Sequence, residues 1–501
     1  MRQARGPLDW LSSESLTDDD NNTPVVTLAI IARPATVSES DPRHGGTIIV
    51  NPGGPSASGV GFMLRAGELV QRTVDSEEEL GGRHYEILSF DPRGVGLTEP
   101  RADCFGGDEF ARGVAWWTDR GLGAVGEAGK DGEGRVDIDT VRRAMARAEG
   151  FGRLCEARNK AAGGEGGIWG FMSTSSVARD MVAIVDKLEE LRKKTLAVDA
   201  AAVRTVSDED EEAQLRIELR SAGDEKEEDT TPRIQFWGFS YGSALGNYFA
   251  SMFPGRVGRM ILEGVEDVHD YHSASWGVGL LDTQHVLDHF WETCFRGREA
   301  CALYQRTDPD AAAIRDRVHG FLDSLGAEPA PYVSRATNTF VAVTKHDVLD
   351  AVLRPLYRPL RDFPALARLL SEALQGNLTL LYSSLNRAST HKDSCSNNST
   401  DLRAYTWGPD AMTAVACGDG EPQDNLTATD FADYVADLQK RQNADFAFLE
   451  AQVRLGCSGW RIRPKYRFDG PWTTPPRQTK MHAFPEDRPR PSCSCPAGTT
   501  P

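Results

Sequence analysis

The sequence has 501 residues, of which 40% are hydrophobic and 26% are charged, and its formal net charge is −18. This length and composition are typical of a globular protein with a large core and one to three domains. The acidic balance argues against a nucleic-acid partner, because phosphate binding needs a basic surface. The sequence contains no run of 18 or more apolar residues, so no transmembrane helix is expected.

Cysteines and glycosylation sequons favour a protein of the secretory pathway. The nine cysteines show no zinc-ligand spacing. Five Asn-x-Ser/Thr acceptors are present: Asn21, Asn377, Asn397, Asn398 and Asn425. The N-terminus has basic residues but lacks the apolar segment of a signal peptide. Because the cysteines and sequons still favour secretion, we expect a secreted protein whose leader is missing from this sequence. The alternative is a cytoplasmic protein with buried thiols.

Two β-branched, apolar runs near the N-terminus, residues 25–33 and 47–50, predict strands. The second strand leads into a Gly-rich turn, residues 51–59, in which Gly53 and Gly54 bring main-chain N–H groups toward a ligand. In a hydrolase such groups stabilise an oxyanion. The turn alone is equally typical of phosphate binding or of a simple tight turn, although it lacks the Gly-Lys-Ser/Thr ending of a phosphate loop.

A helix over residues 60–74 and a strand over residues 85–90 are predicted next. The strand is followed by the loop at residues 91–100, which contains Asp-x-Arg-Gly-x-Gly. We interpret Asp91 and Arg93 as residues that hold loops together rather than as residues that carry out chemistry.

Residues 101–170 are irregular and Gly-rich, with one predicted helix at 141–162. A disulfide between Cys104 and Cys155 is one way to close this excursion. A capped helix is predicted over residues 177–191, because its apolar residues share one face.

The most informative stretch lies between a strand at residues 234–237 and a helix at residues 243–253. The sequence there is Gly238-Phe-Ser-Tyr-Gly, in which Gly238 and Gly242 flank Ser240. Gly-x-Ser-x-Gly between a strand and a helix is the nucleophile elbow of α/β-hydrolases, and the flanking glycines let strand and helix approach. The alternative is a plain Gly-rich turn. The pattern therefore favours Ser240 as a nucleophile.

A further strand at residues 259–265 completes a strand–helix alternation that predicts a mainly parallel sheet with helices on both faces. The pattern then becomes all-helical, which predicts a cap over the active site. Its expected helices are at residues 276–295, 310–325, 346–356, 363–373 and 430–455. Plausible disulfides within it are Cys294–Cys301 and Cys417–Cys457, with Cys395 left unpaired.

The predicted fold class is α/β, with this sheet, a helical cap and incomplete C-terminal strands. The predicted parts are a flexible N-terminus (1–24), an α/β core (25–266) with a disordered acidic insertion (193–231), a helical cap (267–457) and an irregular Pro-rich tail (458–501).

Three loops in this order resemble one branch of the α/β-hydrolases, the tripeptidyl aminopeptidase and prolyl iminopeptidase-like serine peptidases. The motifs are Gly-Phe-Ser-Tyr-Gly, Asn-Pro-Gly-Gly-Pro and Asp-Pro-Arg-Gly-Val-Gly. The resemblance covers about residues 8–472. It implies that Ser240 is the nucleophile and that the main-chain N–H groups of Tyr241 and Gly54 form the oxyanion hole. It also implies exopeptidase-like cleavage near a free N-terminus, with a peptide or small acyl compound as substrate.

The family's triad continues from Ser to an Asp and then a His, and neither of the two later motifs is present in this sequence. The resemblance therefore implies an aberrant or lost C-terminal part, and we expect impaired activity, because a serine hydroxyl is activated by an imidazole. His482, His269 and His272 are weak candidates for a substitute base. Glu266 or Asp267 is a candidate triad acid at the end of the sixth strand.

The preferred hypothesis is a serine hydrolase of peptides. The alternatives are a carboxylic-ester hydrolase and a non-catalytic remnant that binds peptides. No metal or cofactor site is expected, and the sequence does not predict the oligomeric state.

Overall fold

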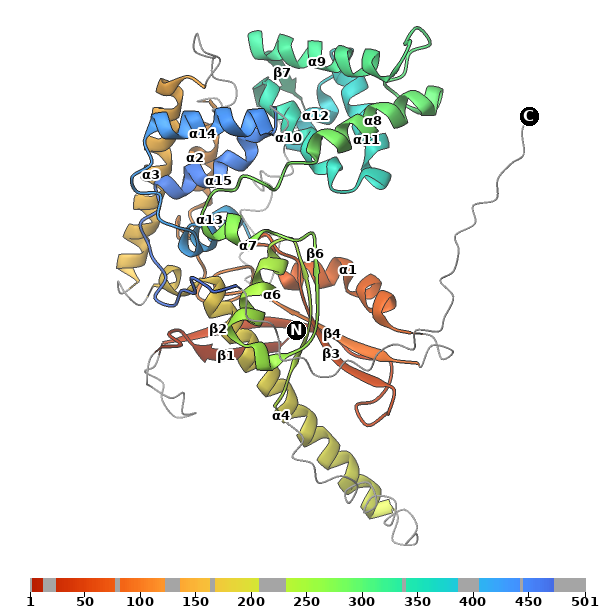
Figure 1. Cartoon of the computed structure of the whole chain (residues 1–501), viewed down its shortest axis with the longest axis vertical. Helices are drawn as coiled ribbons and strands as arrows, with labels where there is room; N and C mark the ends of the chain where they lie inside the picture. Colours follow the sequence, from red (N-terminus) through yellow and green to blue (C-terminus); the bar gives the residue numbers. More distant parts are fainter. Residues whose placement is uncertain are drawn as a thin grey trace, which may run out of the picture.

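The structure is a computed structural model (Figure 1) that describes residues 2–11, 24–76, 82–121, 136–162, 167–206, 231–335, 339–385, 405–441 and 445–472. The described part of the chain contains a mostly parallel central sheet and many helices, as predicted. It is compatible with the α/β-hydrolase fold.

Six strands form the central sheet in the order β1-β2-β4-β3-β5-β6. They are β1 (Arg2–Pro7), β2 (Val25–Arg33), β3 (His44–Asn51), β4 (His84–Phe90), β5 (Ile234–Phe239) and β6 (Val257–Glu263). β4, β3, β5 and β6 are parallel, whereas β1 and β2 run antiparallel to their neighbours. Asn51 pairs with Gly238 at the carboxyl ends of β3 and β5. The loops that follow these two strands are therefore neighbours.

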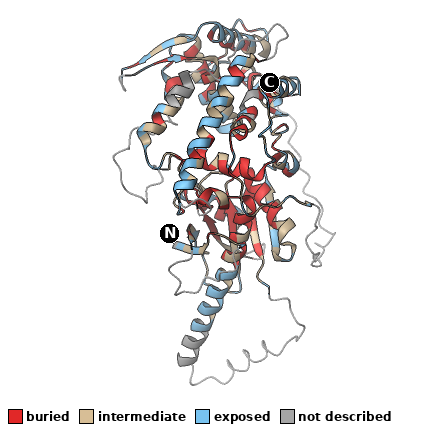
Figure 2. Ribbon diagram, turned by 90° about the vertical axis from the view of Figure 1, so that its left-hand side faces the viewer, coloured by how far each residue is buried: buried red, intermediate tan, exposed pale blue. Residues whose placement is uncertain are grey.

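Helices cover both faces of this sheet. They are α1 (Gly59–Val74), α4 (Thr174–Val206) and α6 (Tyr241–Met252). Successive strand residues point to opposite faces. On one face, Met63 and Val70 of α1 pack with Val50. On the other face, Phe249 of α6 packs in a cluster with Phe236. Figure 2 shows that buried residues concentrate in the middle of the molecule, around the sheet.

The second half of α4 projects away from the sheet, and its residues 190–198 are largely exposed (Figures 1 and 2). The expected disordered insertion at residues 193–231 is therefore corrected in its first part, because the helix continues to Val206. Residues 193–206 are rich in alanine, which favours a helix without tertiary support. The ion pair of Lys194 with Glu190, at 2.6 Å, adds a contact between successive turns. The acidic part, residues 207–230, lies outside the described residues.

A separate group of helices lies above the sheet in Figure 1 and has its own core. Its elements are α8 (Thr283–Gly297), α9 (Ala311–Ala327), β7 (Ala330–Ser334), β8 (Thr339–Val343), α10 (Lys345–Leu356), α11 (Pro359–Leu374) and α12 (Thr379–Leu385). The expectation of an all-helical cap is wrong here, because β7 and β8 form an antiparallel hairpin. Val341 and Val343 on one face of the hairpin join the core of this group. Short strands of this kind lack the long periodic pattern on which the helix predictions depended.

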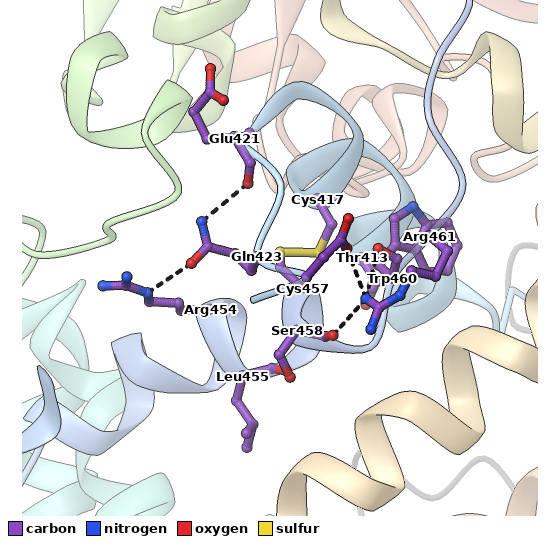
Figure 3. The surroundings of a disulfide bond; sticks show 12 residues. Thr413, Cys417, Glu421, Gln423, Arg454, Leu455, Cys457, Ser458, Trp460 and Arg461 are labelled. Carbon is purple, nitrogen blue, oxygen red and sulfur yellow. Dashed lines mark hydrogen bonds and ion pairs between the residues drawn. A yellow bond between two sulfur atoms is a disulfide. The ribbon is translucent and has the colours of Figure 1, made fainter. Parts of the chain in front are cut away.

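The remaining α-helices are α2 (Glu109–Gly121), α3 (Ile138–Ala161), α7 (Val268–His272), α13 (Gly408–Asp419), α14 (Ala428–Arg441) and α15 (Ala447–Ser458). In Figure 1, α2, α3, α14 and α15 lie to the left of the α8–α12 group, and α7 and α13 lie between that group and the sheet. The single helix expected at residues 430–455 is wrong, because α14 and α15 are two helices. Residues of α3, α14 and α15 share a third core. Figure 3 shows the Cys417–Cys457 disulfide, which joins α13 to α15. Beside it, Arg454 donates to Gln423, and Gln423 donates to the Glu421 carbonyl.

The N-terminal residues also differ from the expected flexible segment. Residues 2–7 form the edge strand β1, and Gly6 pairs with Val26 of β2. Leu8 is buried in the main core. An edge strand is held by main-chain hydrogen bonds on one side and needs no apolar alternation, so its sequence gave no strand signal.

Three disulfides are present among the described residues: Cys104–Cys155, Cys294–Cys301 and Cys417–Cys457. These are the three pairings that the sequence suggested. Cys395 and the residues from 473 onward, including the expected Pro-rich tail, lie outside the described residues. Of the helices that the structure describes, none combines the length and the apolar character needed to cross a bilayer.

Candidate active site

Ser240 forms the corner between β5 and α6. Its φ of 54° and ψ of −126° lie in a region that residues with a side chain rarely adopt. The main chain of the corner is anchored, because the Ser240 N–H donates to the Glu263 carbonyl and the Ser243 N–H donates to the Ser240 carbonyl, at 2.9 and 2.8 Å. Ser240 is exposed, and no described residue forms a hydrogen bond with its hydroxyl. A strained main chain therefore presents a free hydroxyl at the carboxyl edge of the sheet.

The glycines on each side of Ser240 are required by close main-chain approaches. A Cβ atom at Gly238 would lie 2.2 Å from the carbonyl oxygen of Gly242. A Cβ atom at Gly242 would lie 2.6 Å from the carbonyl oxygen of Asn51. Any side chain at either position would push α6 away from the ends of β3 and β5, and the corner would open.

The Gly-rich turn after β3 lies directly against this corner. Gly53 has a φ of +89°, and a Cβ atom there would lie 3.0 Å from both the Ser240 Cβ atom and the Tyr241 nitrogen. The Gly53 N–H donates to the buried Asn51 side chain at 2.9 Å. Gly54, the next residue, is exposed and has a φ of +116°. The structure thus brings Ser240, Tyr241 and the Gly53–Gly54 turn together.

The main-chain N–H groups of Gly54 and Tyr241 have no hydrogen-bond acceptor among the described residues. Tyr241 is the first residue of α6, so its N–H belongs to the first turn, whose N–H groups have no partner within a helix. Unpaired amides at a helix N-terminus favour a negative charge. These two groups are therefore available to an anionic oxygen.

Asp91 is fully buried and accepts hydrogen bonds from three donors. These are the Ser58 hydroxyl at 2.7 Å, the Val60 N–H at 3.0 Å and the Leu97 N–H at 2.7 Å. Burial is the main cause that raises the pKa of Asp91, and the Leu97 N–H opposes it. Its contacts join the start of α1 to the loop after β4. This geometry supports the interpretation of Asp91 as a residue that holds loops together.

Arg93, in the same loop after β4, also links separate segments of the chain. It is buried and forms a bidentate pair with Asp180 of α4, at 2.7 and 2.8 Å. It also donates to the carbonyl oxygens of Pro7 and Leu8. Trp10 donates to the same Asp180 carboxylate at 2.8 Å. Asp180 was missed from the sequence, because its partners lie 87 and 170 residues away.

Asp419, at the end of α13, is a second buried carboxylate that was not among the expected site residues, and it is linked through Thr174 to the Tyr241 side chain. It is completely buried and accepts from the Thr174 N–H at 2.9 Å, the Thr174 hydroxyl at 2.5 Å and the Tyr271 hydroxyl at 2.7 Å. The Thr174 hydroxyl also contacts the Tyr241 hydroxyl. Burial raises the pKa of Asp419 to about 6. This network joins α13, α4 and α7 to the residue that follows Ser240.

The candidate acids Glu266 and Asp267 follow β6 and differ in their environment. The Glu266 N–H donates to the Ser243 hydroxyl, which donates to the Ser240 carbonyl, at 2.8 and 2.6 Å. Burial, together with the charges of Asp270 and Asp267, raises the pKa of Glu266 to about 7. The Asp267 side chain instead caps α7 through the N–H of His269 at 2.8 Å.

Two of the three candidate histidines, His269 and His272, are described, and neither forms a hydrogen bond with Ser240. His272 lies 3.3 Å from Glu421 and 3.7 Å from Asp469, and its ring packs on Trp472. Burial lowers the pKa of His272, and Arg467 adds to this effect. The ring of His269 also packs on Trp472. His482 lies outside the described residues. Among the residues that the structure describes, no imidazole lies within hydrogen-bond distance of Ser240.

The α/β sheet and the strand–serine–helix corner are compatible with the α/β-hydrolase fold. Comparison with known proteins indicates the same class at low identity. Serine protease Hip1 of Mycobacterium tuberculosis (strain ATCC 25618 / H37Rv) is 24% identical over 337 residues, which are 67% of this chain and 50% of that protein. Tripeptidyl aminopeptidase of Streptomyces lividans is 24% identical over 247 residues, 49% of this chain and 33% of that protein.

Carboxylesterase B of the same Mycobacterium tuberculosis strain is 36% identical over 83 residues, 17% of this chain and 14% of that protein. No protein-family model matches the chain. The chain spans about half the length of the Hip1 relatives. The names of these relatives indicate a serine hydrolase, and they include enzymes of both peptides and esters.

Proposed function

We propose that this chain is a serine hydrolase in which Ser240 is the nucleophile. The observation that carries the proposal is the strained, exposed serine with the Gly53–Gly54 turn packed against it. In the proposed reaction the Ser240 hydroxyl attacks a carbonyl carbon. The developing oxyanion accepts from the N–H groups of Tyr241 and Gly54. As it collapses to the acyl-enzyme, the C–N or C–O bond breaks and the amine or alcohol leaves with the serine proton, and water then hydrolyses the acyl-enzyme to the free acid and Ser240. Gly238, Gly242 and Gly53 hold the corner, and Asp91 and Arg93 hold the surrounding loops.

The proposed substrate is a peptide cleaved near its free N-terminus. The resemblance to tripeptidyl aminopeptidases and the relative of that name support this choice. A carboxylic ester is the alternative, supported by the relative named carboxylesterase. The corner itself does not distinguish the two, because an amide and an ester form the same tetrahedral oxyanion.

We further propose that turnover by this chain is slow, because Ser240 has no imidazole beside it in the described part of the structure. An oxyanion hole and substrate binding without a triad still accelerate hydrolysis by roughly 10³–10⁴-fold over water in the best-studied proteases. Glu266 and Asp267, after β6, stay candidates for a triad acid, and an acid without an imidazole restores little activity. The alternative is a chain that binds peptides without turnover.

A fluorophosphonate probe tests the nucleophile. Labelling of the purified chain is expected at Ser240 and is expected to disappear in Ser240→Ala. Ser383→Ala is the matched control, since Ser383 is an exposed serine on α12 and should leave labelling unchanged. Absent labelling of folded protein, or labelling that survives in Ser240→Ala, would contradict the assignment.

Three substrates then separate the candidate activities: a tripeptide anilide with a free N-terminus, its N-acetylated form, and a short p-nitrophenyl ester. Preference for the free N-terminus supports the exopeptidase, and cleavage of the ester alone supports the esterase. Tight binding of the peptide without measurable turnover supports the non-catalytic alternative.

The three disulfides favour an oxidising compartment, because such bonds rarely persist in the cytosol. We propose a secreted or secretory-pathway location. Thiol titration of denatured protein isolated from its source is the test. Six free thiols at these cysteines would instead support the cytoplasmic alternative.

A further inference from the structure

The Tyr241 side chain is tied to a buried carboxylate through one intervening hydroxyl group. The Tyr241 hydroxyl is buried, and its one hydrogen-bond partner among the described residues is the Thr174 hydroxyl. The Thr174 hydroxyl in turn donates to Asp419 at 2.5 Å. Because a threonine hydroxyl has a single proton, and that proton points to Asp419, the Tyr241 hydroxyl is the donor to Thr174. Each hydroxyl of this chain therefore donates toward Asp419.

Asp419 is itself held from several sides. Its carboxylate also accepts from the Thr174 N–H at the start of α4, at 2.9 Å, and from the Tyr271 hydroxyl of α7, at 2.7 Å. Its carbonyl accepts from the Arg467 Nε at 3.1 Å. The disulfide in Figure 3 fixes α13 one turn or less before Asp419. A group that positions another needs little freedom of its own, and this carboxylate meets that requirement.

The main chain of Tyr241 benefits from such an anchor. Ser240, the residue before it, has a φ of 54°, a conformation that persists only where the surroundings hold it. The Tyr241 N–H has no acceptor among the described residues, so no hydrogen bond of its own fixes its direction. Groups that stabilise an oxyanion have to be held within about 0.5 Å of the productive position. A tether on the side chain therefore adds to the hydrogen bonds of α6 in orienting this N–H.

We propose that Asp419 is a positioning residue of the oxyanion hole: through the Thr174 hydroxyl it holds the Tyr241 side chain, and with it the Tyr241 N–H. This role rests on the proposed function, because it takes the Tyr241 N–H as a donor to the oxyanion. The alternative is that Asp419 only stabilises the N-terminus of α4, where a negative charge is favourable. In that case a change at Asp419 does not reach Tyr241.

The charge of Asp419 decides the direction of these hydrogen bonds. The ionised carboxylate accepts from the Thr174 hydroxyl and N–H and from the Tyr271 hydroxyl. After protonation, one of the two hydroxyls has to accept the carboxyl proton instead of donating its own. Burial raises the pKa of Asp419 to about 6. The tether of Tyr241 is therefore complete above this pH and is disturbed as the pH falls through it.

The other groups that face Asp419 do not titrate in this range. Burial raises the pKa values of three tyrosines on α6 and α7, namely Tyr241, Tyr248 and Tyr271. Arg467 stays positively charged, and α4 contributes the uncharged Thr174. His272, next to Tyr271 in the chain, has a pKa that burial lowers from 6.5, so it is the group whose titration has to be separated from that of Asp419.

The Tyr241 N–H can be observed alone. Ser240-Tyr241 is the only Ser–Tyr pair in the sequence, so ¹³C-carbonyl serine combined with ¹⁵N tyrosine gives one correlated amide signal in NMR. This signal is expected to titrate with a midpoint of about pH 6 in the wild type. The titration should disappear in Asp419→Asn and should lose most of its amplitude in Thr174→Val, which keeps the carboxylate but removes the connecting hydroxyl.

Tyr271→Phe is the matched control for this signal. It removes another hydroxyl from the same carboxylate and leaves the link from Asp419 through Thr174 to Tyr241 intact. The Tyr241 signal should therefore still titrate in this variant, with a shifted midpoint. A merely structural role of Asp419 predicts the same small response in Thr174→Val and in Tyr271→Phe.

The rate of fluorophosphonate labelling at Ser240 measures the consequence for the oxyanion hole. Asp419→Asn and Thr174→Val are expected to be labelled roughly tenfold more slowly than the wild type, because a misplaced donor stabilises the oxyanion less. Asp308→Asn should be labelled at the wild-type rate, since Asp308 is also buried but pairs with Arg317 of α9. Circular dichroism checks that each variant is folded.

The inference is overturned by a Tyr241 signal that does not titrate in the wild type, or that titrates as fully in Asp419→Asn or Thr174→Val. Wild-type labelling rates in both variants overturn it as well. Wild-type protein that is folded but not labelled at all contradicts the proposed function instead. The amide titration needs no activity, so it still decides whether Asp419 holds Tyr241.

Discussion

The residues that shape the corner at Ser240 are mostly glycines, and their role is steric. Gly53 must have a positive φ and must also leave room for the Phe239 carbonyl, which would lie 2.4 Å from a Cβ atom. Gly376, after α11, has nearly the same φ of +84° but no atom within 4 Å of a Cβ position. A comparison of substitutions at Gly53 and Gly376 therefore separates the free-energy cost of the left-handed conformation from the cost of the main-chain clash.

Gly53→Ala is therefore expected to destabilise the fold by roughly 2–4 kcal/mol and to abolish probe labelling of Ser240, because strain and a main-chain clash add together. Gly376→Ala is expected to cost about 1 kcal/mol, from the left-handed conformation alone. Denaturant unfolding measures both changes. Equal effects of the two substitutions would mean that the turn does not pack against the corner.

Asp419 predicts a pH dependence of stability. Its pKa is raised from 3.8 to about 6 by burial, so the folded state holds the proton more tightly than the unfolded state. The stabilisation is complete below about pH 4 and is lost as the pH rises through about 6, a change of about 3 kcal/mol. Asp419→Asn cannot ionise, so the difference in unfolding free energy between wild type and variant should shrink by this amount over that range.

Asp308 is a control, because its pKa is shifted in the opposite direction to that of Asp419. The hydrogen bond from Arg317 is the main cause that lowers the pKa of Asp308. Its stabilisation is therefore present above about pH 4 and is lost as the pH falls below that value. The difference between wild type and Asp308→Asn should grow with pH through this range. Parallel curves for the two variants would contradict the assigned environment of Asp419.

At the scale of elements, the disulfides join segments at very different separations. Cys104–Cys155 spans 51 residues and joins the loop before α2 to α3, whereas Cys294–Cys301 spans 7 residues at the end of α8. In the chain-entropy description, a cross-link restricts the unfolded chain more when it closes a longer loop.

Replacing Cys104 and Cys155 by alanine is accordingly expected to cost about 4 kcal/mol, and replacing Cys294 and Cys301 about 2.5 kcal/mol. Denaturant midpoints of the two double variants, with the other disulfides oxidised, measure this order. A larger loss from the short loop would show that native contacts of the cysteines, rather than loop closure, set the stability.

The elements also show what local patterns predicted well. Long amphipathic helices such as α1 and α9 were expected within one or two residues, because their periodic apolar residues fix both type and length. β1 and the hairpin β7–β8 were missed, because short strands are stabilised by pairing with a neighbouring strand, which the local sequence does not predict. The lost C-terminal strands stay a prediction, and residues 459–472, the last that the structure describes, contain no strand.

At the scale of the whole molecule, the described residues have separate apolar cores. The group α8–α12 packs around its own cluster, whereas the sheet packs with α4, α6 and α13. Leu370 is completely buried in the first cluster, and Leu360 on the same helix, α11, is completely exposed. The two leucines give a matched pair for testing whether the α8–α12 group unfolds independently of the sheet.

Leu370→Ala is expected to destabilise the α8–α12 group by roughly 2–5 kcal/mol, because it leaves a cavity. Leu360→Ala should change stability by less than about 0.5 kcal/mol. Hydrogen exchange measures where the loss occurs. Amides of residues 283–385 should exchange faster in Leu370→Ala while those of β3 and β5 keep their protection. Uniformly faster exchange would indicate that the two parts unfold together.

The sequence by itself determined the strand, the Gly-x-Ser-x-Gly corner and the helix after it, because the strained conformation of Ser240 and the close approach of Gly238 to Gly242 arise among residues adjacent in the chain. It also indicated the glycine turn as a source of amides. Only the tertiary structure decided that Asp419 meets Thr174, 245 residues away, and that Arg93 pairs with Asp180. Such contacts depend on how distant elements pack, and no local pattern of residues encodes them.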